Sequence, residues 1–208
     1  KAGIAGPVTH AAIFDGEDYD ERQMWWNKDD LSQPELNTEF QGEVFPTDGA
    51  EIYHRWDIAL SPVKAYTWKG ATGATDDQYG KVNIVEEFAP GKPMTVRPGE
   101  TLVIDFGQNA SAVPAFEFKA KEGTVLTCLP AELLNDGNGA KSRGMDGPEG
   151  SCHRTNLRIP NTGMQLHYTF AFNVRCLFAR HPDYTYYTPR STFFGYRYVS
   201  ITATADVH

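Results

Sequence analysis

The chain has 208 residues, of which 27 are acidic and 19 basic, so its formal net charge is -8. This length can bury the core of one large domain, and a hydrophobic fraction of 40% excludes a disordered chain. The acidic balance argues against a nucleic-acid partner, whose phosphates require Lys and Arg. No apolar run reaches the roughly 20 residues of a membrane-spanning helix. The 4 Trp, 10 Tyr and 12 Phe, with 19 Gly and 13 Pro, favour β-structure.

The first 60 residues have weak hydrophobic periodicity and predict an irregular lead-in. An acidic turn is expected over residues 15–20 and one helical turn over 20–27. Residues 51–60 alternate between polar and apolar side chains, as a half-buried strand does. The Gly-rich polar stretch 67–80 predicts a loop.

From residue 81 onward, short runs with a period of two alternate with Pro-Gly or Gly turn signals. A turn is expected near 131–134 and a long surface loop over 135–151. The expected strands cover residues 81–88, 94–96, 101–106, 115–120, 124–129, 152–159, 164–176 and 190–204. Turn signals spaced by about ten residues are typical of a sandwich or barrel. The sequence therefore predicts an all-β fold, an antiparallel β-sandwich of jelly-roll type.

Four segments resemble bacterial α-L-rhamnosidases of glycoside hydrolase family 78. They are His10–Trp26 (HAAIFDGEDYDERQMWW), Leu102–Asn109 (LVIDFGQN), Ala120–Asp136 and Tyr187–Val199 (YTPRSTFFGYRYV). The order of the four segments is also that of the family. The long aromatic insert 170–187 departs from the family pattern, so the resemblance implies a divergent member.

The resemblance also implies how the chain is organised and what it does. Residues 1–60 would be the tail end of a preceding β module, and residues 61–208 a β-sandwich domain. In this family a helical (α/α) barrel that follows the sandwich hydrolyses terminal α-L-rhamnose, and its acidic signature has no counterpart here. We therefore expect a non-catalytic domain, inactive alone, whose partner is the rest of its own polypeptide. Export to the periplasm or outside the cell is favoured over the cytoplasm.

The motif residues are expected to be structural, with no catalytic residue among them. They are Asp105, Gly107, Gln108, Asn109, Glu132, Gly195 and Arg197. A carboxylate at Asp105 can accept hydrogen bonds from the backbone of the following turn. Arg190 and Arg197 can each pair with an acidic residue on a neighbouring strand. Glu132 is expected to have a structural or domain-interface role.

An alternative function is a carbohydrate-binding module that recognises rhamnose-containing glycans. Flat aromatic rings can stack on sugars, and the candidates are Trp25, Trp26, Trp56 and Trp68. Ordinary packing of these large side chains is the favoured interpretation. A free-standing interaction protein is a third hypothesis.

No cofactor and no metal are expected. Asp136, Asn138 and Asp146 could offer oxygens to calcium, but turn chemistry explains this Gly-rich stretch without a metal. The cysteines are Cys128, Cys152 and Cys176, without the spacing of a zinc or redox site. We expect ordinary packed thiols, and whether any two pair stays open.

Overall fold

A computed structural model describes residues 8–12, 16–20, 59–90, 92–121, 123–138, 147–155, 167–171, 184–188 and 194–208. Within these ranges the regular elements are strands, and no α-helix occurs. The strands are β1 (Val8–Ala12), β2 (Gly16–Asp20), β3 (Lys64–Thr72), β4 (Lys81–Glu87), β5 (Thr101–Ala112), β6 (Phe116–Phe118), β7 (Val125–Ala131), β8 (Leu133–Leu134), β9 (Cys152–His153), β10 (His167–Ala171), β11 (Thr185–Tyr187) and β12 (Phe194–Ala203). No helix long and apolar enough to cross a membrane occurs among the described residues.

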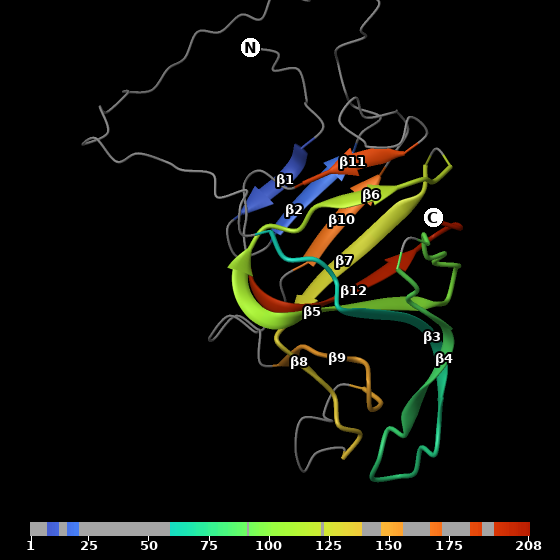
Figure 1. The fold of residues 1–208 in the computed structure, drawn as a ribbon. Coiled ribbons are helices and arrows are strands. Elements are labelled where there is room, and N and C mark those ends of the chain that lie inside the picture. Colours follow the sequence, from blue (N-terminus) through green and yellow to red (C-terminus); the bar gives the residue numbers. More distant parts are fainter. Residues whose placement is uncertain are drawn as a thin grey trace, which may run out of the picture.

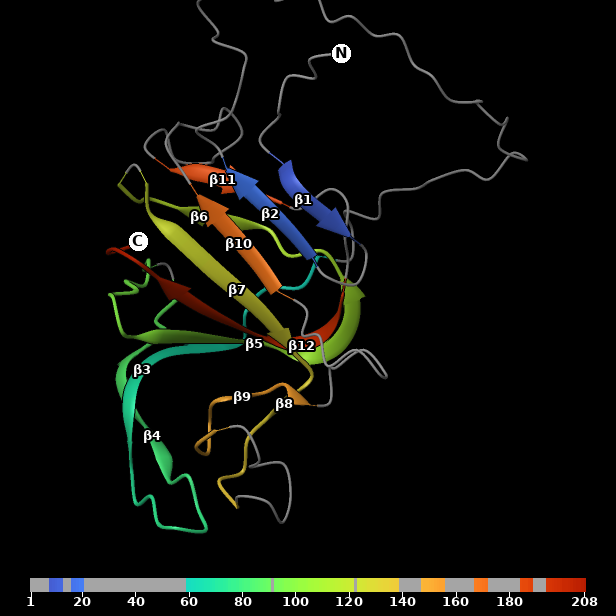
Figure 2. The same ribbon diagram turned by 180° about the vertical axis from the view of Figure 1, so that it is seen from behind.

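One large curved sheet organises the molecule (Figures 1 and 2). Its strand order is β1-β2-β10-β7-β12-β5-β3-β4. The neighbouring strands are antiparallel except β10 and β2, which pair in parallel. Two small two-stranded sheets, β11-β6 and β8-β9, complete the described fold. This architecture confirms the predicted all-β antiparallel sandwich.

The large sheet buries side chains on both faces, because successive residues of a strand point to opposite sides. Ala65 and Leu102 belong to the larger hydrophobic cluster, which also contains Phe118 of β6. Their sequence neighbours Tyr66 and Val103 belong to a second cluster, with side chains from β8 and β9 packed against it. The β6–β11 pair therefore covers one face and the β8–β9 pair the other.

The larger cluster joins the two layers of the sandwich. Its buried members are Ala65, Val96, Leu102, Phe118, Leu126, Cys128, Tyr187, Phe194, Tyr196, Val199, Ile201 and Val207. An apolar cavity of about 270 Å³ lies in the same layer, between the large sheet, β6 and residues near Met94. Burial raises the pKa of the Cys128 thiol, so this group is protonated and packs as a small hydrophobic residue.

Several predicted element boundaries are wrong, because hydrogen bonding to partner strands determines where these elements begin and end. The predicted irregular lead-in and its acidic turn over 15–20 instead contain β1 and β2, because β2 hydrogen-bonds to the distant β10. The predicted loop over 67–80 contains the second half of β3, where Trp68 pairs with both β4 and β5 while Ala71 and Thr72 pair with β4. The strand expected over 94–96 is a single bridge between Val96 and Val207.

Other expectations are confirmed or lie outside the description. The strand over 81–88 corresponds to β4, and the turn near 131–134 is replaced by the end of β7 and by β8. The helical turn expected over 20–27 lies outside the described residues beyond Asp20, and so does the strand expected over 51–60 except for residues 59 and 60, which are not in a strand. The boundary between a lead-in and a sandwich at residue 60 stays a prediction.

Candidate functional site: the bulge of β5

The predicted end of a strand at Gly107 is instead a bulge within β5. Tyr196 of β12 pairs with Ala110, whereas Tyr198 pairs with Asp105, so residues 106–109 lie opposite Arg197 alone. Gly107 has a φ of 83°, in the left-handed region that glycine adopts most readily. This extra length pushes the backbone of residues 107–109 out of the ladder, and these residues are exposed. Bulges of this kind redirect side chains at the edge of a site.

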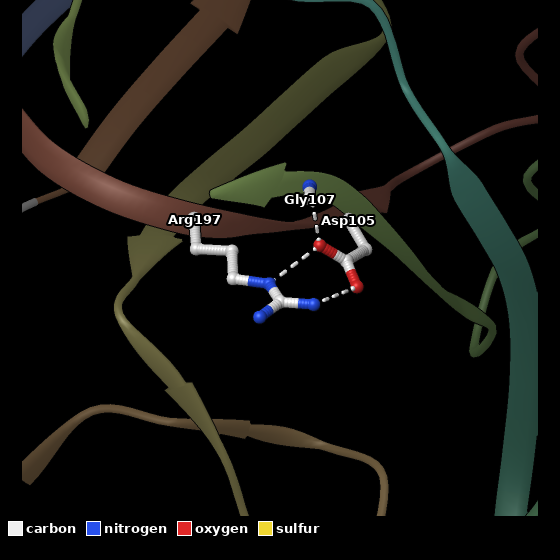
Figure 3. A network of polar contacts seen from close by, with 3 residues as sticks. All are labelled: Asp105, Gly107 and Arg197. Atoms are coloured by element: carbon white, nitrogen blue, oxygen red, sulfur yellow. Dashed lines mark hydrogen bonds and ion pairs between the residues drawn. The ribbon is translucent and has the colours of Figure 1, made fainter. Parts of the chain in front are cut away.

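The bulge is fixed by a forked ion pair between neighbouring strands (Figure 3). Arg197 Nε donates to Asp105 Oδ1 at 2.8 Å, and Arg197 Nη2 donates to Oδ2 at 2.9 Å. The Gly107 N–H also donates to Asp105 Oδ1, at 2.7 Å. The guanidinium lies 5.0 Å from the centre of the Tyr198 ring. Both contacts expected of Asp105 and Arg197, a turn bond and a cross-strand pair, are present.

The ion pair keeps the Asp105 carboxylate ionised. Partial burial alone would raise the pKa of Asp105, but the hydrogen bonds from Arg197 and Gly107 outweigh it and lower that pKa. The same hydrogen bond raises the pKa of Arg197. A carboxylate held in this way is a poor proton donor. The geometry therefore suits a structural role for Asp105 better than the acid of a glycosidase pair.

A second polar contact crosses the same region. Asn109 Nδ2 donates to Glu132 Oε1 at 3.2 Å. Asn109 belongs to β5 and Glu132 directly follows β7, so the contact spans β12, which lies between these two strands. The Glu132 side chain passes over Gly195, where an added Cβ would lie 3.7 Å from Oε1. That distance is an ordinary van der Waals contact, so a Cβ at 195 would fit beside the carboxylate. Gln108 is the exposed middle residue of the bulge.

The structure therefore brings together the seven residues that the sequence motifs single out. Two of their strands, β5 and β12, are far apart in the sequence and adjacent in the sheet. Their structural role is argued from these contacts and stays a prediction.

Sequence reasoning missed a buried polar cluster beside β8 and β9. Asn135 Nδ2 donates to Ser151 Oγ at 2.9 Å and to the Cys152 carbonyl at 3.2 Å. Its Oδ1 lies 3.1 Å from His153 Nδ1, which therefore carries the proton toward the amide oxygen. Ser151 Oγ donates to the Pro148 carbonyl at 2.7 Å. The serine contacts the asparagine rather than the histidine, so this cluster is not a nucleophile–base pair.

One of the four candidate tryptophans lies among the described residues, and a sugar-binding role for any of them stays a prediction. Trp68 is half-buried and packs against the cluster of Tyr66, Val82 and Val103. Trp25, Trp26 and Trp56 lie outside the described residues.

The described residues of the Gly-rich loop are explained by turn chemistry. The Asn138 N–H donates to Asp136 Oδ1 at 3.2 Å, which is the hydrogen bond of an Asx turn. Asp146 lies outside the described residues. No group of acidic, histidine or cysteine residues suited to a metal occurs in the described part of the chain.

The fold defines the class of this protein as an antiparallel β-sandwich domain. Residues 95–207 match the family described as the bacterial alpha-L-rhamnosidase concanavalin-like domain. The match covers more than half of the chain, including β5, β7 and β12 with the bulge, and the chain belongs to this family.

Relatives are much longer than this chain. An α-L-rhamnosidase from Alteromonas sp. (strain LOR) is 24% identical over 204 residues, which are 97% of this chain and 17% of that relative. Among solved structures, an α-L-rhamnosidase from Dictyoglumus thermophilum has 19% sequence identity and a TM-score of 0.44. The aligned region covers 98% of this chain and 19% of the Dictyoglumus chain. An α-L-rhamnosidase from Streptomyces avermitilis, complexed with L-rhamnose, has 21% sequence identity and a TM-score of 0.44. The aligned region covers 95% of this chain and 15% of the Streptomyces chain.

Proposed function

We propose that this chain is a non-catalytic β-sandwich domain of an α-L-rhamnosidase and supports a separate catalytic (α/α) barrel. The family match over residues 95–207 carries this proposal. The full-length enzyme would hydrolyse terminal α-L-rhamnose. The chain corresponds to 17% of the Alteromonas relative, which leaves ample length for a catalytic domain in such an enzyme.

The chemistry of the bulge supports a role without catalysis. Both oxygens of Asp105 accept hydrogen bonds within the domain. Glu132 is bound by Asn109 across β12. A glycosidase requires one carboxyl group that donates a proton and a second that activates water or attacks the sugar. Both carboxylates are instead used to hold strands together.

Activity measurements on matched polypeptides test this proposal. Three proteins are assayed on an aryl α-L-rhamnoside. They are the purified 208-residue chain, the full-length rhamnosidase that contains it, and a deletion variant of that rhamnosidase from which these 208 residues have been removed. We expect turnover by the full-length enzyme, none by the chain alone, and a less stable enzyme when the domain is deleted. Turnover by the chain alone, or a deletion variant as stable and active as the full-length enzyme, would contradict the proposal.

A further inference from the structure

We propose that the apolar cavity between the two layers of the sandwich is a binding site for a neutral aromatic molecule of about two fused rings. The cavity has a volume of about 270 Å³. A domain that only supports a catalytic barrel requires no ligand, so this site is additional to the proposed function. The lining, the size and the mouth of the cavity each limit the molecules that fit.

The deep part of the cavity is lined by apolar side chains. Its floor contains Ala65 of β3, Leu102 of β5, Ile201 of β12 and Leu126 of β7, from four neighbouring strands of the large sheet. All four are buried. The aromatic residues of β6 (Phe116–Phe118) line it as well. Such side chains offer water no hydrogen bonds, so an apolar molecule is favoured over water against them.

The cavity arises because the two layers differ in length. The strands β6 and β11 have three residues each, whereas β5 has 12 and β12 has 10. So short a pair covers only part of one face of the large sheet. Half-buried Met94 also lines the space, and its flexible side chain can adapt to a ligand.

The volume of the cavity sets the size of the ligand. An apolar cavity of about 150 Å³ accommodates one benzene ring. The space of about 270 Å³ is nearly twice as large, and it far exceeds the voids that close packing usually leaves. A molecule of roughly two fused rings therefore fits without rearrangement of the layers.

The mouth of the cavity determines which substituents the ligand can carry. Lys92, Ala115 and His208 line the cavity and are exposed, so they mark its opening to solvent. The charged lining residues Lys92 and Glu117 have opposite signs, so the lining favours neither an anion nor a cation. A neutral aromatic molecule with one hydroxyl group at the mouth suits it. A sugar does not, because its hydroxyl groups would lose their hydrogen bonds to water over the apolar floor.

Binding is tested on the purified 208-residue chain with 2-naphthol, followed by NMR of the methyl groups. We expect saturable shifts at Leu126 and Ile201, with a dissociation constant of about 0.1–1 mM. The methyl groups of Ile84, exposed on the edge strand β4, should not move. An excess of L-rhamnose should leave the shifts unchanged.

Two substitutions remove the space in different ways. Ala65→Leu fills the floor, and Ala115→Trp blocks the mouth at an exposed position. The matched control for Ala115→Trp is Ala74→Trp, because Ala74 is also exposed and also lies outside the strands. We expect both cavity substitutions to weaken 2-naphthol binding about tenfold or more, and the control to leave it within about twofold.

The melting temperature reports whether the added side chain of Ala65→Leu enters open space. Filling a cavity should leave it unchanged or raise it, whereas overpacking lowers it. The proposal is overturned by a lowered melting temperature of this variant, by the absence of saturable binding to the unsubstituted chain, or by equal binding to Ala115→Trp and Ala74→Trp. None of these results would contradict the support of a catalytic barrel, which the activity assay tests separately.

Discussion

The Asp105 residue connects three segments of the chain through one side chain and one carbonyl. Its carboxylate binds Gly107 within β5 and Arg197 in β12. Its main-chain oxygen accepts the N–H of Val63, just before β3. Three neighbouring strands therefore meet at a single residue, and the shape of the bulge depends on its charge.

Asp105→Asn should reveal that charge in the pH dependence of stability. The folded-state pKa of Asp105 is lowered, so its contribution is complete above the ordinary carboxyl pKa of about 4 and is lost as the pH falls through the folded pKa. We expect the variant to lose about 1–2 kcal/mol of unfolding free energy at pH 7, since the guanidinium is partly solvated. Urea unfolding of the purified chain measures this at pH 7 and at lower pH. The gap should close below about pH 4; a gap that widens on acidification would contradict the assignment.

Gly107→Ala tests the backbone conformation of the bulge. Gly107 has a φ of 83°, and Gly73 has a φ of 79° with open space around it. The left-handed conformation costs a residue with a Cβ about 1–2 kcal/mol. We expect Gly107→Ala and the control Gly73→Ala to destabilise the chain by similar amounts, because the exposed Val63 side chain can move aside. Chemical denaturation gives both values. A neutral Gly107→Ala would mean that the bulge has another backbone path.

Among the elements, strands with clear alternation could be predicted and strands defined by partners could not. Residues 81–87 alternate and form β4. The second half of β3 has mostly small or polar side chains and one glycine, and it is a strand because β4 pairs with it. Local composition carries no information on such pairing. Gly107 was predicted to end the strand that begins at residue 101. Glycine is common both at a β-bulge and at the end of a strand, so local sequence does not distinguish the two.

Tyr66→Phe tests how the segment around Gly150 is attached to the large sheet. The Tyr66 hydroxyl donates to the Gly150 carbonyl at 2.6 Å. Burial raises the pKa of Tyr66, so the hydroxyl keeps its proton across the range of stability. Loss of this bond should cost about 0.5–1.5 kcal/mol and speed proteolytic cleavage within residues 147–155. Tyr196→Phe is the control, since that ring is 5% exposed, as is Tyr66. Equal cleavage of both variants would show that the tether is dispensable.

On the scale of the whole molecule, the sequence predicts the members of the site but not their arrangement. The bond from Gly107 to Asp105 follows from local chemistry. The partner of Arg197 does not, because any acidic residue on an adjacent strand would serve. The contact from Asn109 to Glu132 requires the strand order β7-β12-β5, which no local pattern reveals. The cluster around Asn135 was missed because its members are polar, buried and brought together only by the fold.

Leu126→Ala tests whether the two layers of the sandwich unfold together. Leu126 of β7 is 5% exposed, belongs to the cluster that also contains Phe118, and lines the cavity of about 270 Å³. Removing its side chain enlarges a space that the surrounding strands already leave open, so little relaxation is expected and the loss should be about 2–5 kcal/mol. The control is Ile84→Ala. Ile84 is 45% exposed, so this substitution should change the free energy of unfolding by no more than about 0.5 kcal/mol. Urea unfolding should show one transition with an unchanged slope. Two transitions, or a cost equal to that of the control, would mean that the layers are stabilised separately.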